Sequence, residues 1–374
     1  MRFTLSSTAL GSHLNTLVKV INSKNSLAIL NCFLFEVKGN VLLITASDNE
    51  NVMKTSIPLE FADGEGQFAV NNQNILNAVK ELPEQPLTID VDTESYAIKV
   101  IYQNGLYNFT GQNAQEYPIT QEMGENATTL TLKSVVLSDN ITRSIFATAS
   151  EELRPVMNGI YFDFTPEALA IVASDGHKLV RNRFYVVKTE NPTSFILPKK
   201  PAMLLKNVLA KDDSEVEIRF DDRNAEFHFG ENSLQCRLIE GRYPNYNSVI
   251  PKNNPNELTI DRKVLIAALR RVLPFASESS QLVRLHIETG KLEISSEDID
   301  FSTSAKEEIV CNYDGNSMNI GFKGSSLNDI LNNLQSEEVV LQLADPSRPC
   351  LILPSQQPED TDVLMLIMPM LLND

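Results

Sequence analysis

Leu169-Ala170-Ile171-Val172, closed by the turn Ser174-Asp175, is one of three copies of a strand and turn in this chain. The other two copies are Leu42-Leu43-Ile44-Thr45 with Ser47-Asp48 and Lys291-Leu292-Glu293-Ile294 with Glu297-Asp298. A second strand motif recurs in step, since Phe3-Thr4-Leu5, Leu130-Thr131-Leu132 and Leu258-Thr259-Ile260 begin 127 and then 128 residues apart. A fixed period of this kind indicates three copies of one structural unit.

Residue pairs that contain proline give the expected ends of the three units. Tyr117-Pro118, Tyr243-Pro244 and Met368-Pro369 each close a unit in this interpretation, and their prolines lie 126 and 125 residues apart. The chain has 374 residues, more than a single hydrophobic core usually organises. We therefore predict an N-terminal domain over 1–126, a central domain over 127–253 and a C-terminal domain over 254–374.

Each unit has the pattern of a strand, a helix and three strands, given twice. Apolar residues recur at helical spacing in six windows, which are 8–21, 72–82, 133–147, 199–210, 262–273 and 324–334. Segments between them alternate apolar and polar residues, as half-buried strands do. The predicted fold class is α+β, with three tandem repeated domains that each pack two helices on antiparallel sheets. The repeats alone leave open a tandem scaffold that forms no ring.

The composition is that of an ordinary globular protein, with 42% apolar and 22% charged residues. No run of about 18 apolar residues occurs, and the N-terminus lacks the features of a signal peptide, so we expect a cytoplasmic protein. Cys32, Cys236, Cys311 and Cys350 form no CxxC pair. This argues against a zinc or redox site and predicts buried, reduced thiols.

The formal net charge of −17 argues against nucleic-acid binding unless the positive charge is segregated. The six helix windows contain 11 Lys and Arg residues, opposed only by Glu81, Asp139 and Asp329. The cations are Lys19, Lys80, Lys133, Arg143, Lys199, Lys200, Lys206, Arg262, Lys263, Arg270 and Arg271. A basic surface on the helices can attract phosphate, because the influence of the acidic remainder decays over about 8 to 10 Å. The alternative is that Lys and Arg are simply good helix formers on solvated faces.

Six short motifs follow one another along the chain. They are Met1-Arg2-Phe3-Thr4-Leu5, Leu27-Ala28-Ile29-Leu30, residues 173–179, residues 240–246, Ile320-Gly321-Phe322 and Met368-Pro369-Met370. In this order, on a triplicated plan, the chain resembles the bacterial DNA polymerase III β subunit family over essentially its whole length. The resemblance implies a DNA sliding clamp, which is a ring-shaped head-to-tail homodimer with helices lining the hole. Such a clamp is cytoplasmic and associated with the nucleoid.

The resemblance also implies a non-enzymatic processivity factor without a cofactor. Its partners would be duplex DNA, bound without sequence specificity, and DNA polymerases, the clamp loader, mismatch-repair proteins and ligase, bound through short linear peptides. The implied peptide pocket consists of Met157, Ser174, Gly176, His177, Lys178, Leu179, Pro244, Val249, Ile367, Met368, Pro369 and Met370. Ser248 and Leu371 stand where the family often has arginine, and Asn373 and Asp374 extend past its usual end, so the peptide preference stays open.

The resemblance and the helix cations together give the candidate DNA contacts and the candidate dimer interface. The DNA contacts are Lys24, Lys80, Arg143, Arg154, Lys199, Lys200, Lys206, Tyr243, Arg270 and Arg271. Glu151, Pro155 and Val156 replace polar or aromatic residues that are common near the hole. The dimer interface would join the strand around Tyr107 and Phe109 to the region of Leu273 and Phe275, which covers unpaired sheet edges.

Enzyme functions fit the sequence less well. Ser174, Asp175 and His177 contain the residue types of a catalytic triad, but residues of one turn cannot normally align a nucleophile, a base and an orienting group. No HxxxH or HExxH spacing offers metal ligands, so no metal site is expected. No phosphate-binding loop is present, which argues against an ATPase. Two alternatives to a clamp remain, a tandem-repeat peptide-binding scaffold that does not encircle DNA and a nuclease with dispersed carboxylates.

Overall fold

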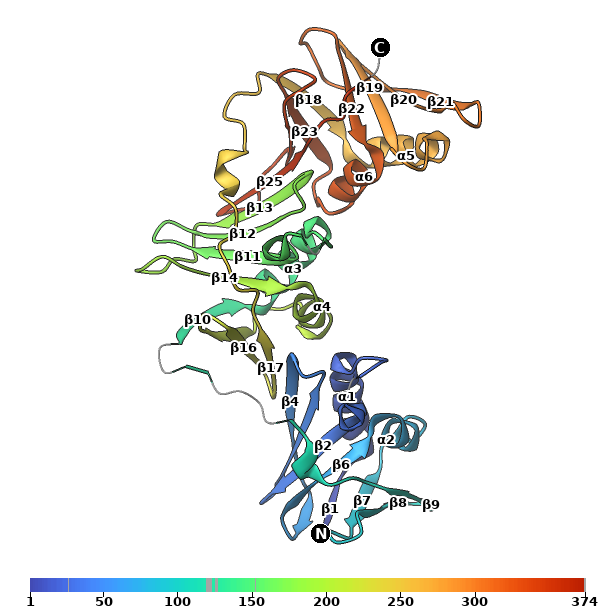
Figure 1. The fold of residues 1–374 in the computed structure, drawn as a ribbon, viewed down its shortest axis with the longest axis vertical. Helices are drawn as coiled ribbons and strands as arrows, with labels where there is room; N and C mark the ends of the chain where they lie inside the picture. The colour runs from blue at the N-terminus through green and yellow to red at the C-terminus, as the bar shows by residue number, and fades with distance from the viewer. Residues whose placement is uncertain (26, 119–122, 125–126, 152, 373–374) are drawn as a thin grey trace. The chain divides into compact units, whose positions relative to one another are not determined.

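The computed structural model describes residues 1–25, 27–118, 123–124, 127–151 and 153–372. Its contacts divide the chain into two compact units, whose elements are labelled in Figure 1. The first unit comprises Met1–Ser138 and Met203–Leu238, and the second comprises Asp139–Ala202 and Ile239–Asp374. The units divide within the helices α3 (Ser134–Ser144) and α4 (Lys199–Val208).

The first unit contains two antiparallel sheets, with strand orders β5-β1-β7-β8-β9 and β10-β15-β16-β17-β4-β3-β2-β6. Helix α1 (Ser7–Leu17) packs against helix α2 (Asn72–Val79) and against β4. The strands are β1 Arg2–Ser6, β2 Cys32–Lys38, β3 Val41–Ser47, β4 Asn51–Pro58, β5 Phe61–Asp63, β6 Gly66–Asn71, β7 Pro86–Val91, β8 Ala97–Tyr102, β9 Gly105–Thr110, β10 Thr128–Lys133, β15 Glu215–Phe220, β16 Asn224–Phe229 and β17 Asn232–Arg237.

The second unit also contains two antiparallel sheets, with strand orders β14-β11-β12-β13-β25-β24-β23-β18 and β21-β20-β19-β22. Helix α5 (Arg262–Val272) packs against α6 (Gly324–Asn332) and against β20 and β21. The strands are β11 Gly159–Phe164, β12 Leu169–Ser174, β13 Lys178–Phe184, β14 Thr193–Pro198, β18 Asn256–Asp261, β19 Leu282–Glu288, β20 Lys291–Asp298, β21 Thr303–Val310, β22 Met318–Lys323, β23 Glu338–Leu343, β24 Cys350–Pro354 and β25 Thr361–Ile367.

Helices α1, α2 and α5 begin at side-chain caps, and α5 and α6 bury the apolar positions that the spacing predicted. The Ser6 hydroxyl accepts a hydrogen bond from the Ala9 N–H at 3.1 Å, and the Asp261 carboxylate accepts one from the Val264 N–H at 2.8 Å. These caps satisfy donors that a first helical turn leaves unpaired. The buried apolar faces of α5 and α6 include Leu265, Leu269, Val272, Leu327, Ile330 and Leu331. The α+β prediction is thereby confirmed.

The turn that recurs in the sequence has one hydrogen-bond pattern in all three copies. Asp48 Oδ1 accepts from two backbone N–H groups, and so do Asp175 Oδ1 and Asp298 Oδ1. A short acidic side chain that accepts from residues two and three positions later stabilises a tight turn. In the second copy the Ser174 hydroxyl donates to the Lys178 carbonyl oxygen at 2.9 Å. The residues that suggested a catalytic triad are therefore turn residues.

Each eight-stranded sheet joins strands from two different predicted domains. β17 pairs with β4 through the register Leu234↔Met53, and β13 pairs with β25 through Val180↔Met365. The predicted fold placed separate sheets in each domain, so this continuity between domains was not predicted. The boundaries after 126 and after 253 stay predictions, since a continuous sheet does not itself mark where a domain ends.

The proline-containing pairs are equivalent in only two of the three repeats. The segments after β9, β17 and β25 each contact a neighbouring strand through the backbone. Gln112, after β9, forms a β-bridge with Ala69, and Met370, after β25, forms one with Gly321. After β17, the Ile239 N–H donates to the Ile196 carbonyl oxygen. Tyr117-Pro118 and Tyr243-Pro244 follow their bridging residues, whereas Met368-Pro369 precedes Met370. The interpretation that Met368-Pro369 is equivalent to the other two pairs was therefore wrong. Its spacing in the sequence is similar, but it lies before the bridging residue of its repeat, whereas the other two pairs lie after theirs.

Candidate functional site

The second unit brings the β12–β13 turn next to the segment that follows β25. Lys178 pairs with Ile367 in the sheet, and the Met368 N–H donates to the His177 carbonyl oxygen at 2.8 Å. Met370 N–H then donates to the Gly321 carbonyl oxygen at 2.8 Å. Two groups of predicted pocket residues that lie far apart in the sequence are thus neighbours.

Asp175 holds the β12–β13 turn through hydrogen bonds and an ion pair. Burial opposes ionisation of this carboxyl, but hydrogen bonds from the Lys178 side chain and from two backbone N–H groups lower its pKa below the usual value. The Lys178 ammonium group also forms an ion pair with Asp175. The charge of Lys178 is therefore engaged inside the turn, so its ammonium is not a free charge for an acidic peptide.

The predicted pocket residues divide into an exposed rim and a buried floor. Val249 and Met368 expose 52% and 37% of their surface, a large fraction for apolar side chains. Gly176, His177 and Pro244 are also exposed, while Lys178, Pro369 and Met370 are half-buried. Met157, Ser174, Leu179 and Ile367 are buried. Exposed apolar side chains on a fixed floor suit the docking of short peptides, because covering them removes apolar surface from water.

A cluster of apolar residues includes the predicted pocket residue Leu179. Its buried members include Ala170, Val172, Leu179, Tyr243, Tyr246, Leu364 and Leu366, and the partly buried Val156 and Ile250 pack against it. Ser248, at the rim, donates its hydroxyl to the Asn245 carbonyl oxygen at 2.6 Å. Leu371 is 87% exposed. Asn373 and Asp374 lie outside the described residues.

Arg154, a predicted DNA contact, lies beside the predicted peptide pocket. Gly176 has a φ of +90°, and a Cβ added there would lie 3.0 Å from Nη1 of Arg154. A side chain at Gly176 would therefore be strained and would crowd this guanidinium. No pattern in the sequence indicates that these two residues are neighbours.

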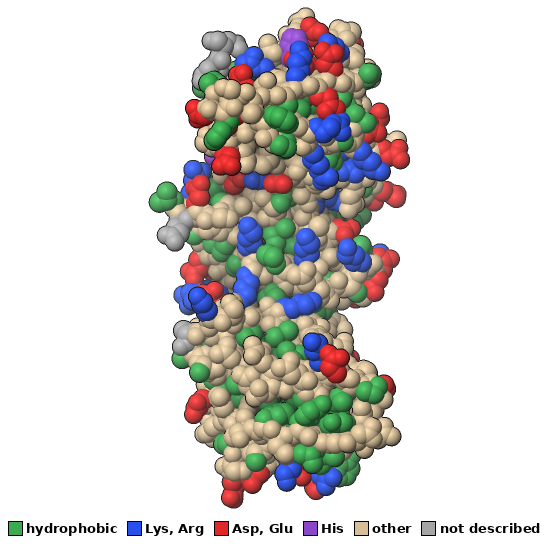
Figure 2. Space-filling view, turned by 90° about the vertical axis from the view of Figure 1, so that its right-hand side faces the viewer, with side chains coloured by type: hydrophobic (Ala, Val, Ile, Leu, Met, Phe, Trp, Pro, Cys, Tyr) green, Lys and Arg blue, Asp and Glu red, His purple; other side chains and the backbone are tan. Residues whose placement is uncertain are grey.

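The Lys and Arg residues are less evenly distributed among the six helices than the sequence windows suggested. Eight of the eleven cations lie within α-helices, on α3, α4 and α5, and the bounds of α1, α2 and α6 contain none. Lys19 and Lys80 follow helices, and Lys133 ends β10. Figure 2 shows exposed Lys and Arg side chains on the face in view, with exposed Asp and Glu side chains among them. Lys24, Lys80, Arg154, Lys199, Lys206, Arg270 and Arg271 are exposed.

Several of these cations are held by neighbouring side chains. Arg271 forms an ion pair with Glu307, and the Arg270 guanidinium donates to Asn332 Oδ1 at 3.1 Å. Burial lowers the pKa of the half-buried Arg143, with Asp139 acting in the opposite direction. A hollow of about 510 Å³ on α5 is lined by Arg262, Lys263, Ile266, Ala267, Arg270, Arg271 and Asn332. Such a hollow can attract anions without selecting a base sequence.

Tyr243 does not fit the predicted role in DNA contact. Its side chain is only 6% exposed, and its ring stacks on Tyr161 with centroids 4.6 Å apart. Burial raises the pKa of its hydroxyl well above the usual range. The ring therefore packs against the sheet and offers little surface to a ligand, which the sequence could not show because the stacking partner is distant in the chain.

The predicted dimer-interface residues lie at sheet edges. Tyr107 and Phe109 are half-buried on β9, the outermost strand of its sheet. Leu273 and Phe275 form a short 3-10 helix that contacts β21, the outermost strand of the four-stranded sheet. Phe275 is 40% exposed, and Val310 at the end of β21 is 85% exposed. Within the part of the chain that the structure describes, each unit thus has an edge strand paired on one side only, which is the feature that strand pairing between subunits requires.

The described residues contain no group of three or more His, Cys, Asp or Glu side chains placed to hold a metal ion. Within the same residues, no helix is both long and apolar enough to span a membrane. The four cysteines are free and buried, in agreement with the prediction from their spacing.

Comparison with known proteins accounts for the triplicated plan. Models of the N-terminal, central and C-terminal domains of the DNA polymerase III beta subunit match residues 1–121, 131–245 and 247–371 in turn. The chain belongs to this family. It has the family's three-domain clamp fold, and because members of the family are non-catalytic sliding clamps, the prediction that the chain is not an enzyme is confirmed.

Relatives and solved structures agree with this assignment. The beta sliding clamp of Pseudomonas putida is 27% identical over 371 residues, covering 99% of this chain and 100% of that protein. That of Haemophilus influenzae is 26% identical over 373 residues, with the same coverage. The crystal structure of the DNA polymerase III subunit beta from Pseudomonas aeruginosa has a TM-score of 0.94 at 26% identity and full coverage of both chains. A DnaN sliding clamp of that organism bound to griselimycin has a TM-score of 0.92 at 26% identity, again with full coverage of both chains.

Proposed function

We propose that two copies of this chain close head to tail into a ring around duplex DNA and tether replication and repair proteins to it. The observation that carries the proposal is the succession of three clamp domains along nearly the whole chain, on a fold with two helices per repeat. Two such chains supply six domains. A closed ring confers processivity by topology, since it needs no tight contact with any base.

Ring closure is supported by the open edges of β9 and β21. Tyr107 and Phe109 lie on the first edge strand, and Leu273 and Phe275 contact the second. In a head-to-tail dimer, β9 of one subunit pairs with β21 of the other, and the contact occurs twice. Apolar side chains such as Val310 are covered in the same step, which favours association.

Attraction to DNA is supplied by exposed cations that contact phosphates. Lys199, Lys206 and Arg270 on α4 and α5 are exposed, and Lys24, Lys80 and Arg154 lie outside the α-helices. Lysine and arginine side chains bind phosphate weakly and without sequence preference, so the ring can slide. The acidic remainder of the chain discourages DNA from binding elsewhere.

Partner proteins bind through short linear peptides at the rim formed by Val249, Met368 and their neighbours. The expected partners are DNA polymerases, the clamp loader, mismatch-repair proteins and ligase, in the cytoplasm and on the nucleoid. A peptide held at the rim keeps its polymerase at high effective concentration near the primer end. The griselimycin complex of the Pseudomonas aeruginosa clamp supports a ligand site on this fold.

The test of encirclement compares circular with linear DNA. The protein is loaded onto a nicked circular plasmid with the clamp loader from the same cells, washed with high salt, and the plasmid is then cut once. We expect the protein to stay on the circle and to leave after the cut. Equal loss from both forms would support the alternative of a peptide-binding scaffold that does not encircle DNA.

A further inference from the structure

The three repeats present one sheet face whose positions correspond through strand register. In this register Leu34 lies opposite Thr45, Tyr161 opposite Val172, and Arg284 opposite Ser295. The next strand places Lys54, Arg181 and Lys306 opposite the second member of each pair. Arg284 in the third repeat therefore occupies the position that Tyr161 holds in the second.

In the second repeat this face is covered by two tyrosines from the segment 243–246 of the same chain. Tyr243 stacks on Tyr161 with ring planes 2° apart. The Tyr246 hydroxyl donates to Asp163 Oδ2 at 2.8 Å. Both tyrosines are buried, at 6% and 7% exposure. The fold thus accommodates an extended aromatic segment on this face.

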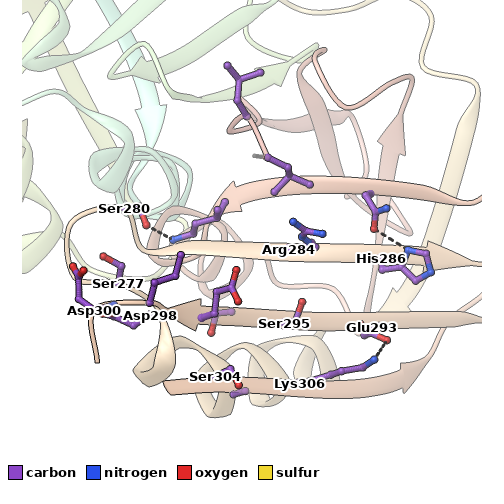
Figure 3. A pocket seen from close by; sticks show the side chains of 18 residues that line it. Ser277, Ser280, Arg284, His286, Glu293, Ser295, Asp298, Asp300, Ser304 and Lys306 are labelled. Carbon is purple, nitrogen blue, oxygen red and sulfur yellow. Dashed lines mark hydrogen bonds and ion pairs between the residues drawn. The ribbon is translucent and has the colours of Figure 1, made fainter. Parts of the chain in front are cut away.

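In the third repeat, as far as the chain is described, the corresponding face borders a cavity of about 980 Å³ (Figure 3). Arg284 and His286 line it from β19, and Glu293 and Ser295 line it from the neighbouring β20. His286 pairs with Asn319 on β22, and Asp163 pairs with Ser194 on β14. His286 therefore occupies the position in the third repeat that Asp163 holds in the second. The residues on the floor of the cavity occupy the same strand positions as the residues that the tyrosines cover in the second repeat, but their side chains are polar.

Apolar side chains at the border of this cavity are left in water. Ile299, in the turn after β20, is 82% exposed, and Leu371 is 87% exposed. Both line the cavity, together with Leu372. The bridge from Met370 to Gly321 holds this tail beside β22. A ligand that covered Ile299 and Leu371 would remove apolar surface from water and gain free energy from it.

The charges along the cavity favour a ligand that carries a cation. Lys306 forms an ion pair with Glu293 at 2.6 Å, and Asp298 is engaged in its turn. Glu297 and Asp300 also line the cavity and form no ion pair within the part of the chain that the structure describes. A basic side chain of a ligand would meet these two carboxylates at one end, while Arg284 lies along the floor.

We propose that this face is a docking site for an extended segment of a partner protein in which an aromatic residue lies beside a basic one. The aromatic ring stacks on the Arg284 guanidinium, as Tyr243 stacks on Tyr161, because a guanidinium binds an aromatic face favourably. The basic side chain pairs with Glu297 and Asp300, and the segment covers Ile299 and Leu371. The site is separate from the Val249 and Met368 rim and does not depend on encirclement of DNA.

The experiment uses a fluorescent peptide that spans residues 239–246 of this chain, which contains Arg242, Tyr243 and Tyr246. Titration with the full-length protein should give saturable binding. Arg284→Ala should weaken binding about three- to thirtyfold, which is the usual range for loss of a cation–aromatic contact. Arg348→Ala, an exposed arginine of the same unit outside the cavity, should leave binding unchanged. A peptide with both tyrosines replaced by alanine should not bind.

Three results would overturn the proposal. They are the absence of saturable binding by the unaltered protein, equal binding by the Arg284→Ala variant, and a loss of binding in a Val249→Asp variant, which would place the peptide at the other rim. Urea unfolding of each variant shows that it folds. Retention on circular DNA, measured on the same Arg284→Ala protein, should be unchanged, so this proposal and the proposed function fail separately.

Discussion

The Arg271 guanidinium on α5 holds the Glu307 carboxylate on β21 through two hydrogen bonds, one of them from Nε at 2.8 Å. The hydrogen bonds from Arg271 lower the pKa of the Glu307 carboxyl, so the pair is ionised at neutral pH. An exposed ion pair of this kind adds little to stability. Its main effect is that it occupies the Arg271 guanidinium, which was predicted to contact a DNA phosphate.

Replacing Glu307 with glutamine should therefore strengthen the binding of DNA. The released Arg271 adds up to one phosphate contact, which steepens the plot of log affinity against log salt by about 0.9. Fluorescence anisotropy with a short duplex at several salt concentrations measures this slope. The control is Glu308→Gln, which frees Lys291 in place of Arg271. Equal slopes for the two variants would mean that Arg271 does not reach DNA.

Truncation of Leu269 should destabilise the second unit. Its side chain is fully buried between α5 and the sheets, so Leu269→Ala removes core contacts and leaves a cavity. Such changes cost about 2 to 5 kcal/mol. Urea unfolding followed by circular dichroism measures the loss. Val264→Ala on the same helix, where the side chain is 44% exposed, should cost far less.

A charge at the rim should reduce peptide binding without affecting the fold. Val249 is 52% exposed and belongs to the predicted pocket, so Val249→Asp places a carboxylate where a ligand would bury apolar surface. We expect at least about tenfold weaker binding of a polymerase-derived peptide, equivalent to about 1.4 kcal/mol. Val186→Asp, at a position that is 68% exposed outside the predicted pocket, is the control and should bind normally. Unchanged binding by Val249→Asp would place the peptide elsewhere.

A charge at the predicted dimer interface should yield monomers. Phe275→Asp puts a carboxylate next to β21, where subunit pairing would bury it. Mass photometry should then detect the 41.7 kDa subunit in place of its dimer. Phe61→Asp is the control, because Phe61 is 52% exposed on β5, at the opposite edge from β9. A dimeric Phe275→Asp variant would count against the predicted interface.

The stability of the first unit should depend on the protonation of His13. Burial lowers the pKa of this imidazole below 6.5, although Glu231 acts in the opposite direction, and its Nδ1 lies 2.7 Å from the Thr55 hydroxyl oxygen. The unfolded chain therefore binds the proton more tightly. The contribution to stability is complete above about pH 6.5 and is lost as the pH falls towards the lowered value. Urea unfolding measured between about pH 5 and pH 8 should show this loss, and His13→Gln should abolish it.

Local features of the sequence determined the helices and the repeated turn. Helical spacing of apolar residues is set by one element at a time, so Leu265 and Leu269 marked the buried face of α5 before any neighbour was known. Asp48, Asp175 and Asp298 accept hydrogen bonds from residues two and three positions later. Such contacts depend on only a few adjacent residues, and their recurrence in three repeats made the turn recognisable in the sequence.

Contacts between distant parts of the chain set which residues are neighbours. The pairing of β13 with β25, the burial of Tyr243 on Tyr161 and the hold of Glu307 on Arg271 all join residues separated by tens to hundreds of positions. Whether a lysine, arginine or tyrosine is available to a ligand depends on such neighbours, because an ion pair or a stacked ring withdraws it. Short-range periodicity was enough to predict the repeated α+β elements, whereas long-range packing sets which of their side chains can bind a ligand.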